Sequence, residues 1–102
     1  MVQLLREGTD GAKEEAARAL WNLAVDAEDC NTIAAAGAIP LLVQLLTEGR
    51  DSAKEQAAGA LGNLTANAEN QKTIAAAGAI PLLVQLLREG TDGAKEEAAG
   101  AL

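Results

Sequence analysis

Apolar and polar residues follow a helical spacing along the chain, and the pattern recurs every 41 residues. Val2 recurs as Val43 and Val84, and Pro40 recurs as Pro81. Apolar positions are spaced by three or four residues and none of the segments alternates with period two, which predicts helices and no strands. A helical pattern with a period of this length is typical of a solenoid, in which each unit is stable only when packed on its neighbours. The pattern therefore predicts an all-α solenoid of about two and a half units in 102 residues.

Each unit contains three predicted helices. The first is short and ends where Gly37 or Gly78 can adopt the left-handed backbone that closes a helix. The second begins near Pro40 or Pro81, since proline suits the first helical position. The third is the longest. The expected ranges are about 31–36 and 71–77 for the first helix, 40–49 and 81–90 for the second, and 11–26 and 52–67 for the third.

The third helix of the middle unit carries two local signals. Ser52 and Glu55 have the spacing of a capping box, in which each side chain binds a free amide at the helix start. In the first unit, Asp10 or Gly11 would have to start the helix. One face of the helix has the spacing of a buried stripe. The stripe consists of Ala53, Ala57, Ala60, Leu61, Leu64 and Ala68.

The repeat register divides the single predicted domain into a partial unit at 1–28, a full unit at 29–69 and a second partial unit at 70–102. Arrays of this kind need terminal units with a polar outer face, and the sequence has none. We expect apolar side chains at both ends to be exposed and to bring chains together as a homo-oligomer, either by pairing of ends or by exchange of helices. These residues are Val2, Leu4 and Leu5 at one end and Ile80, Leu83 and Leu87 near the other.

Composition narrows the classes of partner. Apolar residues make up 49% of the chain, but Trp21 is its one aromatic residue, so the core must consist of Leu, Ile, Val and Ala. The formal net charge of −7 argues against nucleic acid, because such binding depends on Lys and Arg neutralising phosphates. No apolar run approaches the roughly 18 residues of a membrane span, and the start of the chain shows no targeting signal. We expect a soluble protein, cytoplasmic or recombinant, whose charged partners are basic.

The chain offers little for catalysis or for holding a cofactor. It has no histidine and one cysteine, Cys30. A nucleophilic cysteine needs a base or a cationic setting, and a metal site needs clustered ligands. We therefore expect no enzyme activity, no metal and no cofactor, and we expect Cys30, whose counterpart is Gln71, to be an incidental exposed thiol. Trp21 stands where the next unit has Gly62, and it is either an interface anchor or a residue that packs on the neighbouring unit.

Particular phrases in the sequence point to a family. The three-helix unit, the phrase NQKTIAAAGAIPLLVQLL at 70–87, and ALWNLA at 19–24 or ALGNLT at 60–65 resemble the armadillo repeat over the entire chain. HEAT repeats of similar length have two helices and lack the Gly-Ala-Ile-Pro junction found at 37–40 and 78–81. The near identity of the copies favours an engineered sequence over a recent duplication. The resemblance implies a right-handed superhelix whose third helices line a concave groove for extended peptides or partner tails.

The resemblance also implies which residues line this groove. Asparagines of the third helix hold the peptide backbone in the family, and the matching positions are Asn22 and Asn63. An amide side chain offers both a donor and an acceptor. The same asparagines could instead be polar residues of a solvated wall, or could bind a neighbouring helix and fix the stacking. The neighbouring groove positions are Glu15, Arg18, Gln56 and Glu97.

One departure from the family limits the predicted specificity. Members that bind basic localisation signals carry tryptophan four residues before the asparagine, where this chain has Arg18 and Gly59. Recognition of such signals is therefore not expected.

Two hypotheses about function follow. The first is an engineered scaffold without catalytic activity that self-associates through uncapped terminal helices. The alternative is a module that holds extended basic peptides, and it would do so weakly. Two asparagines provide a few hydrogen bonds of about 0.5–1.5 kcal/mol each, against an association cost of about 4–15 kcal/mol.

Overall fold

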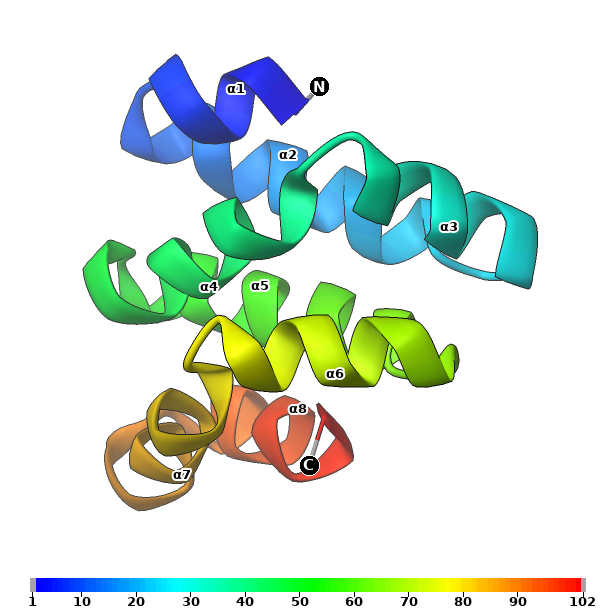
Figure 1. The fold of residues 1–102 in the computed structure, drawn as a ribbon. Helices are drawn as coiled ribbons and strands as arrows, with labels where there is room; N and C mark the ends of the chain where they lie inside the picture. The colour runs from blue at the N-terminus through cyan, green and yellow to red at the C-terminus, as the bar shows by residue number, and fades with distance from the viewer. Residues whose placement is uncertain (1, 102) are drawn as a thin grey trace.

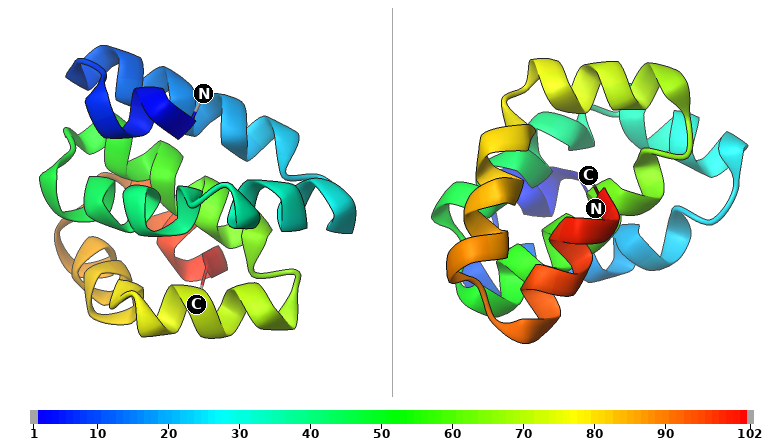
Figure 2. Two further views of the ribbon diagram at one scale, coloured as in Figure 1. Left: turned by 45° about the horizontal axis from the view of Figure 1, so that its top comes forward. Right: turned by 90° about the horizontal axis from the view of Figure 1, so that it is seen from below.

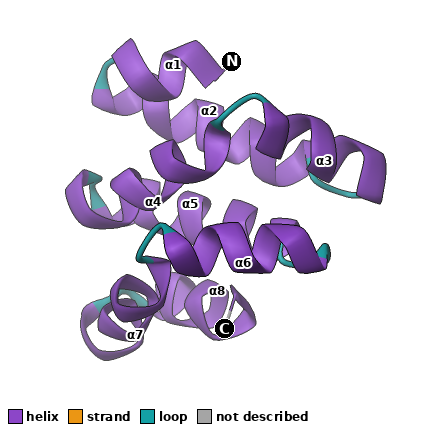
Figure 3. Cartoon of the chain, in the orientation of Figure 1, coloured by secondary structure: helices purple, strands orange, loops and turns teal. Residues whose placement is uncertain are grey.

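The computed structural model describes residues 2–101, without the side chains of Val2, Leu4 and Ala27. In these residues every regular element is a helix, and short loops join one helix to the next (Figure 3). The absence of strands from this part of the chain agrees with the predicted periodicity. The helices are α1 (Val2–Glu7), α2 (Asp10–Leu23), α3 (Ala27–Ala35), α4 (Ala38–Glu48), α5 (Asp51–Leu64), α6 (Ala68–Ala76), α7 (Ala79–Glu89) and α8 (Asp92–Ala101).

The helices stack in three layers (Figure 1). We call α1 and α2 the first layer, α3 to α5 the second and α6 to α8 the third. The column formed by α2, α5 and α8 makes the most extensive contacts between layers, and α1, α4 and α7 form a second column beside it. Seen along the stack, α6, α7 and α8 make three sides of the last layer (Figure 2). The repeated sequence thus gives repeated stacking, as a solenoid requires.

The first helices begin several residues earlier than the sequence pattern predicts, and the third helices end correspondingly earlier. Asp26 and Asn67 cause the change, because each leaves the helical backbone and caps α3 or α6. The Asp26 carboxylate accepts a hydrogen bond from the amide of Asp29 at 2.8 Å. The Asn67 side-chain oxygen accepts from the amide of Glu69, also at 2.8 Å. These side chains satisfy amides that a new helix leaves unpaired, so they separate the two helices.

The third helices begin within one residue of the predicted starts, but the predicted capping residues are wrong. Helix α5 begins before Ser52, directly after Arg50, and no side chain provides a capping hydrogen bond there. In α2 the capping residue is Thr9, rather than either of the two residues that follow it. The Thr9 hydroxyl accepts a hydrogen bond from the amide of Ala12 at 3.2 Å. A polar side chain at the start of a segment therefore did not suffice to locate the cap.

Glycine prepares the start of each second helix. Gly37 and Gly78 both have a φ of +85°, in the left-handed region, as predicted. Helices α4 and α7 begin immediately afterwards, two residues before Pro40 and Pro81. Proline is tolerated at this third helical position because its missing N–H would have had no acceptor within the helix.

The core runs through the stack and is built from small and branched apolar residues. Of the predicted stripe, only Ala68 fails, because it starts α6 and is exposed. The other members, Ala53, Ala57, Ala60, Leu61 and Leu64, are buried. Two residues predicted to be exposed at the ends are also buried: Leu5 is 3% exposed because α1 packs on α4, and Leu83 is 1% exposed because it faces the interior of its own layer.

Candidate functional site

The two predicted groove asparagines have different surroundings. Asn22 lies near the end of α2 and is exposed. Asn63, at the same position in α5, is partly buried, and its side-chain amide donates a hydrogen bond to the backbone carbonyl of Trp21 at 2.9 Å. This bond joins α5 to the preceding layer. For Asn63 the structure therefore supports the interpretation that the amide fixes the stacking.

The neighbouring groove positions carry charges of both signs. Glu15 and Arg18 are exposed on α2 and form an ion pair of 3.2 Å, a kind of surface pair that contributes about 0–1 kcal/mol. Gln56 on α5 and Glu97 on α8 are half-buried. Because Arg18 forms this ion pair with Glu15, the charge of Glu15 on the first layer is compensated.

The third layer has a more acidic edge. Burial raises the pKa of Glu97, and the negative charges of Glu96 and Glu55 raise it further. Glu55 comes from the adjacent α5, and its carboxylate lies so close to Gly93 that a side chain there would collide with it. The structure thus brings carboxylates of two layers together where α5 packs on α8.

Trp21 packs on the neighbouring layer, which decides between the two interpretations of this residue. A Cβ atom at Gly59 of α5 would lie 2.5 Å from Cε2 of the indole, well inside van der Waals contact. At Gly100, the equivalent position in α8, a Cβ would have no neighbour within 4 Å. Gly59 was not predicted as the partner of Trp21, although a glycine where the first unit has Arg18 leaves room for a neighbouring group to approach the backbone closely.

Cys30 is buried, so the prediction of an exposed thiol is wrong. Its side chain is 2% exposed, and the thiol donates a long hydrogen bond of 3.7 Å to the backbone carbonyl of Asn63. Burial is the main cause of a raised pKa at Cys30, and the nearby Asp26 and Asp29 add to it. Helix α5 covers Cys30, whereas the counterpart Gln71 lies in the third layer and is exposed. A thiol of this kind is a poor nucleophile.

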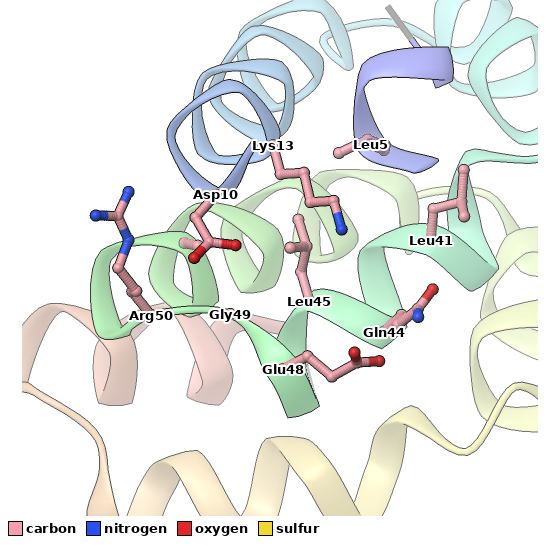
Figure 4. A pocket seen from close by; sticks show the side chains of 10 residues that line it. Leu5, Asp10, Lys13, Leu41, Gln44, Leu45, Glu48, Gly49 and Arg50 are labelled. Carbon is pink, nitrogen blue, oxygen red and sulfur yellow. The ribbon is translucent and has the colours of Figure 1, made fainter. Parts of the chain in front are cut away.

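A small cleft lies between the first and second layers, where the loops join second to third helices (Figure 4). Leu5 of α1 and Leu45 of α4 line it, with Lys13 of α2 and Glu48 of α4 as charged neighbours. The same cleft recurs one period later, between the second and third layers. Its corresponding residues are Leu46, Leu86, Lys54 and Glu89. Successive layers therefore dock in the same way.

An apolar surface remains at the far end of the stack. Ile80, Val84 and Leu87 of α7 are 49%, 36% and 37% exposed, and we call these three residues the end surface. The equivalent residues of α4 are buried beneath the third layer: Ile39 is 1% exposed, Val43 6% and Leu46 3%. Ile80 and Leu87 were predicted to be exposed and are, and Val84 was missed although it lies one turn from each. The predictions for the Val2 and Leu4 side chains lie outside the described residues.

Two further searches cover the described part of the chain. Residues 2–101 contain no group of three or more His, Cys, Asp or Glu side chains arranged to hold a metal ion. None of the described helices is by itself long and apolar enough to cross a membrane, although α3 and α4, bent by 76° at their junction, together have the length and composition of a span.

Sequence comparison identifies the family. The Armadillo/beta-catenin-like repeat matches residues 26–66 and 67–102. The chain belongs to the armadillo repeat family. This membership confirms the resemblance and the predicted fold class, a solenoid of three-helix repeats. None of the curated proteins compared with the chain is similar to it in sequence.

Several solved structures similar to this armadillo chain are engineered proteins. One engineered protein from the Northeast Structural Genomics Consortium is 36% identical with a TM-score of 0.91 over 98% of this chain and 42% of its own. A second is 35% identical with a TM-score of 0.92 over 98% and 41%. A designed armadillo repeat protein, YIII(Dq.V1)4CPAF in complex with the peptide (KR)4, is 30% identical with a TM-score of 0.91 over 98% and 43%.

The chain spans about two fifths of the length of these three proteins. The similarities support the interpretation of this sequence as an engineered armadillo repeat protein.

Proposed function

We propose that this chain is a non-catalytic armadillo scaffold that associates with further copies of itself through the end surface. The observation that supports the proposal is the contrast between two identical sets of residues. Ile, Val and Leu are buried in α4, where another layer covers them, and exposed at the same positions of α7. Exposed apolar side chains that lie together mark interaction surfaces.

The size of the end surface indicates how much of a partner must be involved. Full burial of one aliphatic side chain contributes about 1.5–3 kcal/mol, so three side chains that are less than half exposed contribute roughly 3 kcal/mol together. Association costs about 4–15 kcal/mol. The end surface alone is therefore insufficient, and a stable contact has to cover α8 as well as α7, as the third layer covers α5 as well as α4.

Light scattering over a hundredfold dilution tests the proposal. The parent chain should exceed the monomer mass of 10.4 kDa at high concentration and approach it on dilution. Val84→Glu should remain monomeric throughout, because it places a charge in the contact. Val25→Glu is the matched control, since Val25 is 75% exposed and lies outside the end surface. Circular dichroism would verify that both variants are folded. A parent chain that stays at the monomer mass refutes the proposal.

A second candidate function is the binding of extended basic peptides in the groove. The acidic edge formed by Glu55, Glu96 and Glu97 favours it, as does the basic peptide bound by the designed neighbour. The Asn63 amide, however, already binds the Trp21 carbonyl, so only weak binding is expected.

Titration with (KR)4, with an uncharged (GS)4 peptide as control, tests this candidate. (KR)4 should bind in the millimolar range, and Glu97→Gln should weaken it. Equal signals from the two peptides would refute the candidate.

A further inference from the structure

We infer that the junction between the second and third layers contains an empty binding site for a planar aromatic cation, where α5 packs on α8. We call this site the aromatic seat, and Gly62 of α5 and Gly100 of α8 form it. It lies apart from the end surface on α7, so it is independent of the proposed self-association. The equivalent site at the junction of the first two layers is already occupied by the indole of Trp21.

The indole of Trp21 shows what such a site accepts. A Cβ atom at Gly59 would lie 2.5 and 2.6 Å from Cε2 and Cδ2 of the indole. These two carbon atoms join the two rings, so the middle of the indole lies against the α5 backbone at Gly59. A glycine allows this close approach. At the first junction, one third helix therefore provides an aromatic ring and a glycine of the next third helix receives it.

The second junction keeps the receiving glycine but lacks the ring. Gly100 stands 41 residues after Gly59, and Gly62 stands 41 residues after Trp21. A Cβ atom at Gly100 would meet none of the described residues within 4 Å. Because α2, α5 and α8 pack in one column (Figure 1), the backbone that would receive a ring is in place.

The aromatic seat does not depend on how far α8 extends. Helix α5 continues beyond Gly59 as far as Leu64, and its Leu61 and Leu64 side chains are fully buried. The indole of Trp21 nevertheless lies on Gly59. Further turns of a third helix therefore leave the position of the ring free.

Carboxylates beside the aromatic seat favour a cation. Glu97 precedes Gly100 by three residues, which places it on the same face of α8. Glu55 and Glu96 are close enough for their charges to raise the pKa of Glu97 beyond the effect of its burial. At the first junction the position of Glu97 is taken by Gln56, which is uncharged.

The second junction also lacks a cation that the first one has. Arg50 forms an ion pair of 3.5 Å with Glu14 between the first two layers. One period later Glu14 is replaced by Glu55, but Arg50 is replaced by Thr91, which carries no charge. A ligand that combines an aromatic ring with an ammonium group complements both the empty position and the excess of carboxylates.

Titration of the 15N-labelled chain, followed by nuclear magnetic resonance, tests the inference. The probes are tryptamine, uncharged indole and anionic indole-3-acetate. Tryptamine should shift the amide resonances of Gly62 and Gly100, with a dissociation constant in about the millimolar range for a ligand of this size. Indole should bind about threefold to fivefold more weakly because it lacks the ammonium group, and indole-3-acetate should bind more weakly still.

Variants locate the site. Gly62→Trp provides a ring from the chain itself, as Trp21 does at the first junction, and should abolish tryptamine binding. Gly100→Leu is a second blocking variant that fills the same place from α8. Glu97→Gln should reduce the preference for tryptamine over indole without weakening indole. Trp21→Ala makes the reverse change, so indole should then also shift the amide resonance of Gly59. Circular dichroism would verify that each variant is folded.

Three outcomes would overturn the inference. They are the lack of a saturable shift at Gly62 and Gly100, equal affinities for the three probes, and unchanged tryptamine binding in folded variants that block the seat. Val84→Glu separates this test from the one of self-association. Its titration should match that of the parent chain, because the end surface is not part of the aromatic seat, while light scattering reports association on its own.

Discussion

Replacing Gly59 with alanine probes the contact between the first two layers. Two effects of opposite sign compete. Alanine is favoured over glycine in a helix interior by about 1 kcal/mol, and Gly59 lies within α5. Against this, the new Cβ would lie 2.5, 2.6 and 2.8 Å from three carbon atoms of Trp21. Such overpacking typically costs about 1–3 kcal/mol.

We expect the overlap to decide the sign. Trp21 is only partly buried and can swing outward, which relieves the clash but gives up its packing on α5. Gly59→Ala should therefore lower the free energy of unfolding by about 1 kcal/mol. In a domain of this size, that corresponds to a fall in melting temperature of roughly 4–8 °C. Urea denaturation followed by far-UV circular dichroism would measure it.

Two companion variants isolate the cause. Gly100→Ala is the matched control, because Gly100 occupies the same repeat position with no neighbour within 4 Å; it should be neutral or stabilise by up to about 1 kcal/mol. In a Trp21→Ala background, Gly59→Ala should stabilise the fold, and the difference between the two backgrounds measures the coupling energy. If Gly59→Ala stabilised the parent chain as much as Gly100→Ala does, the inferred packing of Trp21 would be refuted.

Three further predictions concern the glycine turns, the Cys30 thiol and the Glu97 carboxyl. Gly78→Ala should destabilise by about 1–2 kcal/mol, because alanine disfavours the left-handed backbone found there; Gly37→Ala should do the same, and unchanged urea midpoints would contradict the reasoning. The Cys30 thiol should react with a thiol reagent much more slowly in the folded chain than in urea, and equal rates would contradict its burial. A raised pKa means that folding disfavours the charged form of Glu97, so this group stabilises the fold only in acid and the benefit is lost as the pH rises through that pKa. Glu97→Gln should therefore raise the melting temperature at neutral pH but not in acid, unlike Glu15→Gln at the exposed equivalent position; a gain independent of pH would point to another cause.

The fold class and much of each helix could be predicted because the signals are local and repeated. The 41-residue period, the buried stripe of the third helix and the left-handed Gly37 and Gly78 all appear in the sequence within a few residues of the structure they specify. Helix ends were less predictable. Asp26 and Asn67 can continue a helix or cap one, and the side-chain bonds of the folded chain decide between these roles.

The candidate site was predicted less well, because its properties depend on which helices cover which residues. Cys30 and Gln71 occupy the same repeat position, yet Cys30 is buried against the end of α5 in its own layer, whereas Gln71 is exposed. Leu83 looked like an exposed end residue and belongs to the core of its own layer. Periodicity assigns a residue to a face of its helix, but it does not say which faces are turned to a neighbour.

The hydrogen bond from Asn63 to the carbonyl of Trp21 makes the packing of the layers compete with peptide binding for the same amide. A peptide that needs the Asn63 amide as a donor must first break a bond that holds two layers together. Thermodynamic linkage makes this antagonism mutual. A peptide bound at Asn63 would weaken the contact between the two layers, and mutations that weaken this contact would raise the affinity for the peptide. Selection for stability alone would then drive such a scaffold away from peptide affinity at this position.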